Sequence, residues 1–244
     1  MASLKSTMRC IGAETEGSVL RNFFGFFRAR VPTDVLGTTP STVSLKTQMA
    51  RVQQRHVHFN VIRVGFDTFS DSTFDRRMER IDYAILRTQN IYAAVNLGVG
   101  RVTHWRIDSA DADGLDDIGS EDEAEELIER ATVGGGGIDC FVVRNISAGF
   151  IGIAPQKADG VIAGESGLGD ETFAKTFAHE VGHFLSLSHN HGSACPTGTT
   201  ARNNLMAQSR CAAASGEAGQ RVAVLLTAGQ GQAMRGHGST HAPC

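Results

Sequence analysis

Segments rich in apolar residues and segments with a helical period alternate along this chain. His56–Val64, Gly100–Ile107 and Ile138–Ile146 are rich in β-branched and other apolar residues, which predicts three strands. Between the first two, Asp75–Val95 has apolar residues at helical spacing and predicts a helix. Such alternation of strand and helix favours an α/β layer with a mostly parallel sheet.

A second helix is predicted over Ser120–Ala131, which is strongly acidic. Ser120 is suited to the N-cap, and Glu123 stands three residues later, so the pair matches a capping box. This helix falls between the second and third predicted strands, as an alternating fold requires.

A third helix is predicted before residue 186, and its two faces differ in character. At about 100° per residue, one stripe gathers five apolar side chains: Phe173, Phe177, Val181, Phe184 and Leu185. His179 and His183 fall on the opposite side of the same helix. One face is therefore expected to pack into the core while the other lines a cleft.

The histidine face contains the motif H-E-x-x-H, with a further histidine six residues later. His179 and His183 lie one turn apart, so both imidazoles can reach a single ion. Glu180 is placed to act on a water, and His189 would close a three-nitrogen site with an open fourth position, as in catalytic zinc sites. The alternative, two exposed histidines on an amphipathic helix, leaves His189 unexplained.

The extended motif, followed by Asn203-Asn204-Leu205-Met206, resembles the metzincin clan of zinc metalloendopeptidases over roughly residues 57–235. In that clan a tight turn places a methionine beneath the zinc histidines, a role that the resemblance gives to Met206. An ordinary core methionine is the alternative. The spacing H-x-L-S-L-S-H, the Asn-Leu-Met turn and a nearby cysteine are most similar to pappalysin-type metzincins.

The resemblance implies an α/β (α+β) fold: a mixed, mostly parallel twisted sheet with a catalytic helix, and a small irregular C-terminal subdomain below the zinc cleft. We expect an N-terminal extension or propeptide over residues 1–50 and a catalytic subdomain over 51–191. Residues 192–244 would form the C-terminal subdomain, with the methionine turn and a final helix capped by Thr227.

One position departs from the clan. Ser186 stands where a glycine usually lets the helix end in a left-handed conformation, so a serine there implies modest strain or a different turn. This puts the approach of His189 in question, and His191 is the alternative third ligand. The spacing of the motif favours His189.

Two cysteines, Cys195 and Cys211, bracket the Met206 turn, and a disulfide between them would fix the loop below the zinc. Such a bond requires an oxidising compartment, which favours an extracellular enzyme. The alternative is that all five cysteines are reduced. Met1–Lys5 leads into polar residues, which is not typical of a signal peptide. Cys10 loosely resembles the cysteine of a latent metzincin propeptide, although an inert thiol or a disulfide partner is favoured.

Two further segments carry weaker expectations. The resemblance suggests Val161–Gly164 as the edge strand above the cleft, where a substrate main chain could add as another strand. The alternative is an ordinary loop or a buried strand. Asp108–Gly114 is acidic enough to suggest calcium, but it lacks the spacing of a twelve-residue calcium loop, so a solvated loop is favoured.

Composition narrows the function classes. A net charge of −3 argues against nucleic acid as a partner, and no apolar run is long enough to span a membrane. We therefore predict a zinc-dependent metalloendopeptidase acting on protein or peptide substrates, with one Zn²⁺ and Glu180 as general base. Gln208 stands where some metzincins have a tyrosine. The alternatives are a catalytically idle binding module and a zinc hydrolase acting on other substrates.

Overall fold

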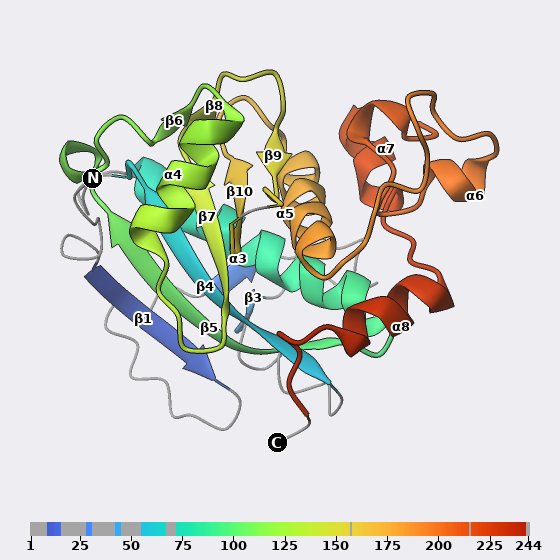
Figure 1. The fold of residues 1–244 in the computed structure, drawn as a ribbon, viewed down its shortest axis with the longest axis horizontal. Coiled ribbons are helices and arrows are strands. Elements are labelled where there is room, and N and C mark those ends of the chain that lie inside the picture. Colours follow the sequence, from blue (N-terminus) through green and yellow to red (C-terminus); the bar gives the residue numbers. More distant parts are fainter. Residues whose placement is uncertain are drawn as a thin grey trace.

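The computed structural model describes the backbone of residues 9–15, 28–30, 42–44, 55–66, 72–156, 158–214 and 216–242, with side chains from residue 55 onward except 72–79. A six-stranded sheet lies at its centre (Figure 1). In order across the sheet, the strands are β1 (Arg9–Thr15), β5 (Gly98–Ile107), β4 (His56–Val64), β7 (Ile138–Val143), β10 (Gly160–Gly164) and β9 (Gly152–Ile153).

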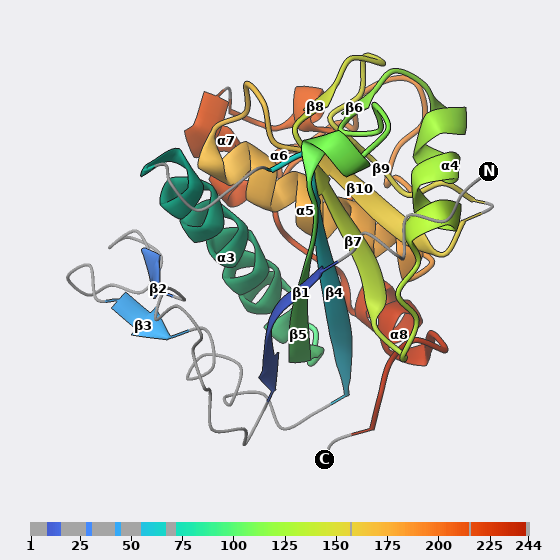
Figure 2. The ribbon, with the colours of Figure 1, turned by 90° about the vertical axis from the view of Figure 1, so that its left-hand side faces the viewer.

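Strand direction confirms the predicted fold class. The four central strands β5, β4, β7 and β10 are parallel, whereas β1 and β9 at the two ends are antiparallel to their neighbours. Parallel strands are connected by helices, and these cover both faces of the sheet. Helices α3 (Ser72–Ala93) and α5 (Asp170–Phe184) cover one face and α4 (Glu121–Ala131) covers the other (Figure 2).

The central strands place apolar side chains on both faces of the sheet, because both faces are covered. In β4, Val57, Phe59 and Val61 belong to the core under α3 and α5, while Ile62 and Val64 belong to the core under α4. Side chains of successive strand residues point to opposite faces, so the apolar residues of one strand contribute to both cores. The bounds of β4 are those predicted from the sequence.

The predicted start of α4 is confirmed in part. Ser120 Oγ accepts a hydrogen bond from the Glu123 backbone N–H at 3.2 Å. In a capping box the Glu123 carboxylate would accept from the Ser120 N–H. Here it accepts instead from the N–H of the preceding residue, Gly119, at 2.7 Å. The first contact satisfies an N–H group that the first turn of a helix leaves unpaired, and the second ties the residue before the N-cap to the helix.

The predicted edge strand is wrong. Val161–Gly164 lies inside β10, which is buried and pairs with β7 on one side and with β9 on the other. The strand at that end of the sheet is β9. It has two residues, too few to produce an alternating pattern in the sequence.

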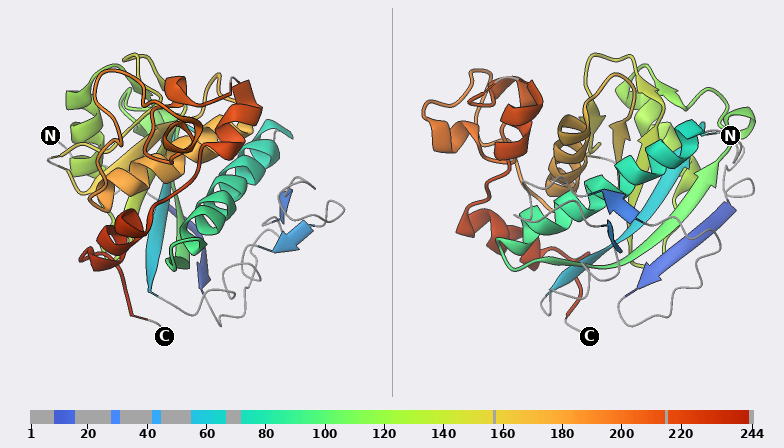
Figure 3. Two further views of the ribbon diagram at one scale, coloured as in Figure 1. Left: turned by 90° about the vertical axis from the view of Figure 1, so that its right-hand side faces the viewer. Right: turned by 180° about the vertical axis from the view of Figure 1, so that it is seen from behind.

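The C-terminal region is built from short helices that gather beyond α5, on the side away from α4 (Figures 1 and 3). They are α6 (Thr199–Arg202), the 3-10 turn η3 (Ser209–Cys211), α7 (Gly216–Val222) and α8 (Ala228–Gly236). As predicted, Thr227 caps α8, through a reciprocal pair of bonds with Gln230. The division of the chain at residues 50 and 191 stays a prediction.

The remaining elements are small: β2 (Arg28–Arg30), β3 (Thr42–Ser44), η2 (Ser109–Asp111), β6 (Asp117–Ile118) and β8 (Asn145–Ile146). The predicted strand Ile138–Ile146 is therefore divided, because β8 leaves the central sheet and pairs with β6. The Cys10 side chain, on which a propeptide switch would depend, lies outside the described residues. None of the helices in the described part has the length and apolar character that crossing a membrane requires.

Candidate metal centre

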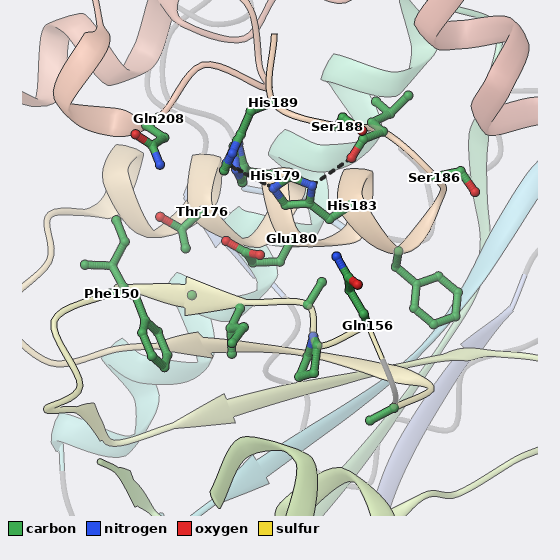
Figure 4. Close-up of a pocket in the computed structure, with 18 of the residues that line it drawn as sticks. Phe150, Gln156, Thr176, His179, Glu180, His183, Ser186, Ser188, His189 and Gln208 are labelled. Atoms are coloured by element: carbon green, nitrogen blue, oxygen red, sulfur yellow. Dashed lines mark hydrogen bonds between the residues drawn. The ribbon is translucent and has the colours of Figure 1, made fainter. Parts of the chain in front are cut away.

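Helix α5 carries two of the three histidines that meet at the centre of the cleft (Figure 4). The Nε2 atoms of His179 and His183 lie 3.0 Å apart, and the Nε2 atom of His189 lies 3.2 Å from each of them. Among the described residues, this is the group of His, Cys, Asp and Glu side chains that could hold a metal ion.

Backbone carbonyls fix the orientation of two of these rings. His179 Nδ1 lies 2.8 Å from the Leu205 carbonyl oxygen, and His183 Nδ1 lies 2.7 Å from that of Leu187. A carbonyl oxygen only accepts hydrogen bonds, so each Nδ1 carries the proton and each Nε2 presents a lone pair. A tetrahedral zinc with Zn–N bonds of about 2.0–2.1 Å brings its nitrogens to about 3.3–3.4 Å from one another, so the donor set fits zinc.

The imidazoles are also held in the neutral form that binds metals. Burial lowers the pKa of His179 to about 3, and burial likewise lowers the pKa of His183 and of His189. At neutral pH all three rings are therefore unprotonated on one nitrogen and free to coordinate.

The turn after α5 explains how a serine replaces the expected glycine. Ser186 adopts the left-handed conformation, with φ of 71°. Its N–H donates to the His183 carbonyl at 2.9 Å, and the Leu187 N–H donates to the Gly182 carbonyl at 3.0 Å. These two bonds form a Schellman motif, so the chain turns as it would with glycine and returns His189 to the helix.

His191, the alternative third ligand, is not part of the triad. Its Nε2 accepts a hydrogen bond from the Gln208 N–H at 3.2 Å, and its Nδ1 lies 2.7 Å from the Gly192 carbonyl oxygen. Its ring stacks on that of His189 with centroids 5.8 Å apart. Both nitrogens are therefore engaged, and His191 supports the neighbouring ring.

Met206 lies directly behind α5 and is fully buried. A Cβ atom at Gly182 would be 2.9 Å from its Sδ, so the helix and the methionine are in close contact. The turn is held by Asn204, whose Oδ1 accepts from the Met206 N–H at 2.9 Å and from Gln230 Nε2 at 3.0 Å. The disulfide between Cys195 and Cys211 is present and closes the loop around this turn.

Two polar side chains that anchor α5, one buried and one exposed, had no signal in the sequence. Lys175, one turn before His179, is buried and donates from Nζ to the Ala207 carbonyl at 3.0 Å, and burial lowers its pKa to about 8. Glu217 of α7 accepts from the Glu171 N–H at 2.8 Å at the start of α5. Both contacts join residues more than 30 positions apart in the sequence. Helical periodicity does not predict contacts between such distant residues.

Glu180 lies beside the triad and is 6% exposed. Burial raises the pKa of its carboxyl group to about 8, and a hydrogen bond from the Ala154 backbone partly opposes that shift. A Cβ atom at Gly152 would lie 2.8 Å from Glu180 Cγ and 2.9 Å from its Oε1. Glycine on β9 therefore allows the strand to approach the carboxylate closely.

The triad and Glu180 open into a cleft of about 1060 Å³. One wall is the segment 149–156, which includes β9, and the floor is α5 (Figure 4). The opposite wall is formed by residues 186–189 and 208–210, and His237 and Ser239 also line the cleft. The arrangement places three imidazole nitrogens and one buried carboxylate in one open cleft.

The sequence matches a known family over residues 41–190, described as metallo-peptidase family M12B, reprolysin-like. The match covers more than half of the chain and includes His179, Glu180, His183 and His189. This chain belongs to that family. M12B metallopeptidases use zinc, and the histidine triad of this reprolysin-like protein is a site that could bind it.

Other comparisons add little. No curated protein matches the chain. One solved structure, described as "Structure of a chaperone-substrate complex", is 16% identical with a TM-score of 0.35. The alignment covers 61% of the present protein and 27% of the chain in the solved structure. A similarity of this size supports no inference about function.

The acidic segment considered for calcium contains ion pairs. Asp108 contacts Arg106 at 2.7 Å and Asp113 contacts Arg130 at 3.1 Å. Two of its carboxylates therefore already face guanidinium groups, and nothing in this arrangement supports calcium binding.

Proposed function

We propose that the protein is a zinc-dependent metalloendopeptidase. The observation that carries this proposal is the convergence of three Nε2 atoms at 3.0–3.2 Å beside a buried glutamate in an open cleft. His179, His183 and His189 would hold the ion. When bound, zinc supplies Lewis-acid chemistry, because it makes water more acidic and polarises a carbonyl group.

Glu180 is the general base in this proposal. Its carboxylate takes a proton from the attacking water as the water oxygen adds to the peptide carbon, and then passes that proton to the leaving amine. The same residue therefore serves as base and as acid in one cycle.

Strand β9 is the element along which we place the substrate. It stands at the end of the sheet beside the cleft, so an extended peptide could pair with it as a further antiparallel strand. Gly152 brings this strand to Glu180, which would hold a paired peptide bond near the carboxylate. The substrate class is thus an extended segment of protein or peptide.

Two other functions compete with a zinc peptidase. A catalytically idle member of the fold would bind a partner through the cleft, but the retained Glu180 and its burial support an enzyme. A zinc hydrolase acting on a non-peptide substrate would use the same triad. The strand edge beside the site favours a peptide.

Two finer proposals accompany the function. The Cys195–Cys211 disulfide supports an extracellular location, because such bonds persist in oxidising compartments. The similarity to pappalysin-type metzincins rests on the spacing of the motif, the Asn-Leu-Met turn and a nearby cysteine, and it stays a prediction.

A peptide-library digest of the zinc-loaded protein, with and without a zinc chelator, tests the function. We expect cleavage at internal bonds that stops with chelator and returns with added zinc. Metal analysis should give one zinc per chain. A protein that binds zinc and cleaves no peptide would contradict the proposal and favour the binding module.

A further inference from the structure

Gln208 lies two residues beyond Met206 and forms part of the cleft wall that faces β9. It is half-buried, and its side chain stands at the same end of the cleft as His189 and Thr176 (Figure 4). The amide nitrogen points down into the cleft and the oxygen points away from it. A neutral hydrogen-bond donor therefore faces the space beside the triad.

The orientation of this amide is set by Arg210. Arg210 Nε donates to Gln208 Oε1 at 2.8 Å, and Arg210 Nη2 donates to the Ser193 carbonyl at 3.2 Å. A guanidinium group can only donate, so the amide atom that faces it must be the oxygen. The NH₂ group is consequently turned toward the cleft.

The backbone of Gln208 is fixed as well. Its N–H donates to His191 Nε2 at 3.2 Å, and the ring of His191 stacks on that of His189. No hydrogen bond from Gln208 Nε2 to another described residue is present. The donor is thus held in place from two sides and left free for a ligand.

Other uncharged donors also line the cleft, among them Gln156 on the wall that includes β9 and Thr176 on α5 (Figure 4). Gln156 is exposed, and no hydrogen bond to another described residue fixes its amide. Thr176 is less suited to contact a substrate. Its hydroxyl has no hydrogen-bond partner among the described residues, but the oxygen is enclosed by its surroundings. Gln208, by contrast, is partly open to the cleft.

We propose that Gln208 is a catalytic residue whose Nε2 donates a hydrogen bond to the scissile carbonyl oxygen, and that Arg210 is its positioning residue. This inference rests on the proposed peptidase function. As water adds to the carbonyl carbon, its proton goes to Glu180 and the carbonyl oxygen takes up the electron pair of the π bond. A donor already oriented toward that oxygen stabilises the developing charge without reorganising during the reaction.

Kinetics of the zinc-loaded enzyme on one cleaved peptide test the proposal. Removing a single donor of this kind lowers kcat by roughly 10²–10³-fold, so we expect Gln208→Leu to lower kcat about 100-fold with little change in KM. Arg210→Met should lower kcat less, by about 3–10-fold, because the amide is retained and only its orientation is lost. The matched control is Gln232→Leu on the exposed side of α8, which should leave both parameters unchanged.

A binding measurement gives a readout besides turnover. A phosphinic peptide carries a tetrahedral anionic group in place of the scissile bond, so it probes affinity for the transition state. By titration calorimetry, Gln208→Leu should bind it about 10–100-fold more weakly, with zinc content unchanged, whereas Gln232→Leu should bind it as the wild type does.

The outcomes separate the two claims. Unchanged kcat and phosphinic affinity in Gln208→Leu, or a rise in KM alone, would overturn the role of Gln208 while leaving the peptidase function intact. A wild-type protein that binds zinc without cleaving peptides would overturn both.

Discussion

Gly182 and Met206 are in such close contact that a Cβ atom on the glycine would lie 2.9 Å from the methionine Sδ. Gly182 lies between the two helical histidines and Met206 is fully buried, so a side chain at residue 182 would require Met206 or the helix to shift. The contact ties the helix that carries His179 and His183 to the turn that contains Met206.

Gly182→Ala tests this contact. We expect it to lower the free energy of unfolding by about 1–3 kcal/mol, the usual cost of overpacking a core, and to weaken zinc binding because the helix must shift. Urea denaturation and a competitive zinc titration measure the two effects. Gly229→Ala, in α8 with open space around it, is the control and should not lower stability. Unchanged stability and zinc affinity in Gly182→Ala would show that the contact has no consequence.

Ser186→Gly should stabilise the protein. A left-handed conformation costs a residue with a Cβ atom about 1–2 kcal/mol, and glycine gives back part of that gain through its flexibility when unfolded. The expected net increase in unfolding free energy is about 0.5–1 kcal/mol, measured by urea denaturation. Ser188→Gly, two residues on and not left-handed, should stabilise nothing. A loss of stability in Ser186→Gly would contradict the interpretation of the turn.

Histidines whose pKa is lowered by burial determine how the stability of the metal-free protein depends on pH. Burial lowers the pKa of His104 and His179 to about 3 and that of His58 to about 4. The ordinary pKa of histidine is 6.5. At pH values below it, these side chains are protonated in the unfolded chain but not in the folded chain. The free energy of unfolding therefore falls as the pH falls from about 6.5 toward 4.

Each such histidine contributes a slope of up to about 1.4 kcal/mol per pH unit near pH 5. Urea denaturation of the metal-free protein between pH 7.5 and 5 measures the total. Metal-free His179→Asn should show a shallower slope than the wild type. Identical slopes would mean that His179 takes up a proton in the folded state.

The sequence predicted what depends on local period and spacing. The apolar run of β4 gave its bounds directly, and the apolar stripe of α5 is buried as expected, with Phe184 only half-buried. The H-E-x-x-H spacing placed His179 and His183 on one helix face, where their nitrogens now lie 3.0 Å apart.

What the sequence did not predict depends on contacts between distant segments or on very short elements. Strand β9 has two residues and leaves no periodic signal, so the edge of the sheet was assigned to β10. Helical spacing likewise gave no indication that Lys175 would be buried against the Ala207 carbonyl. That partner is supplied by a loop that follows the helix.

The central claim is tested most directly by Glu180→Gln, which keeps the shape of the side chain and removes the base. Zinc content and peptide hydrolysis should be measured on the same preparations of wild type and variant. We expect one zinc per chain in both and a loss of hydrolysis of about 10²-fold or more in the variant. Peptidase activity retained at the wild-type level in zinc-loaded Glu180→Gln would contradict the mechanism.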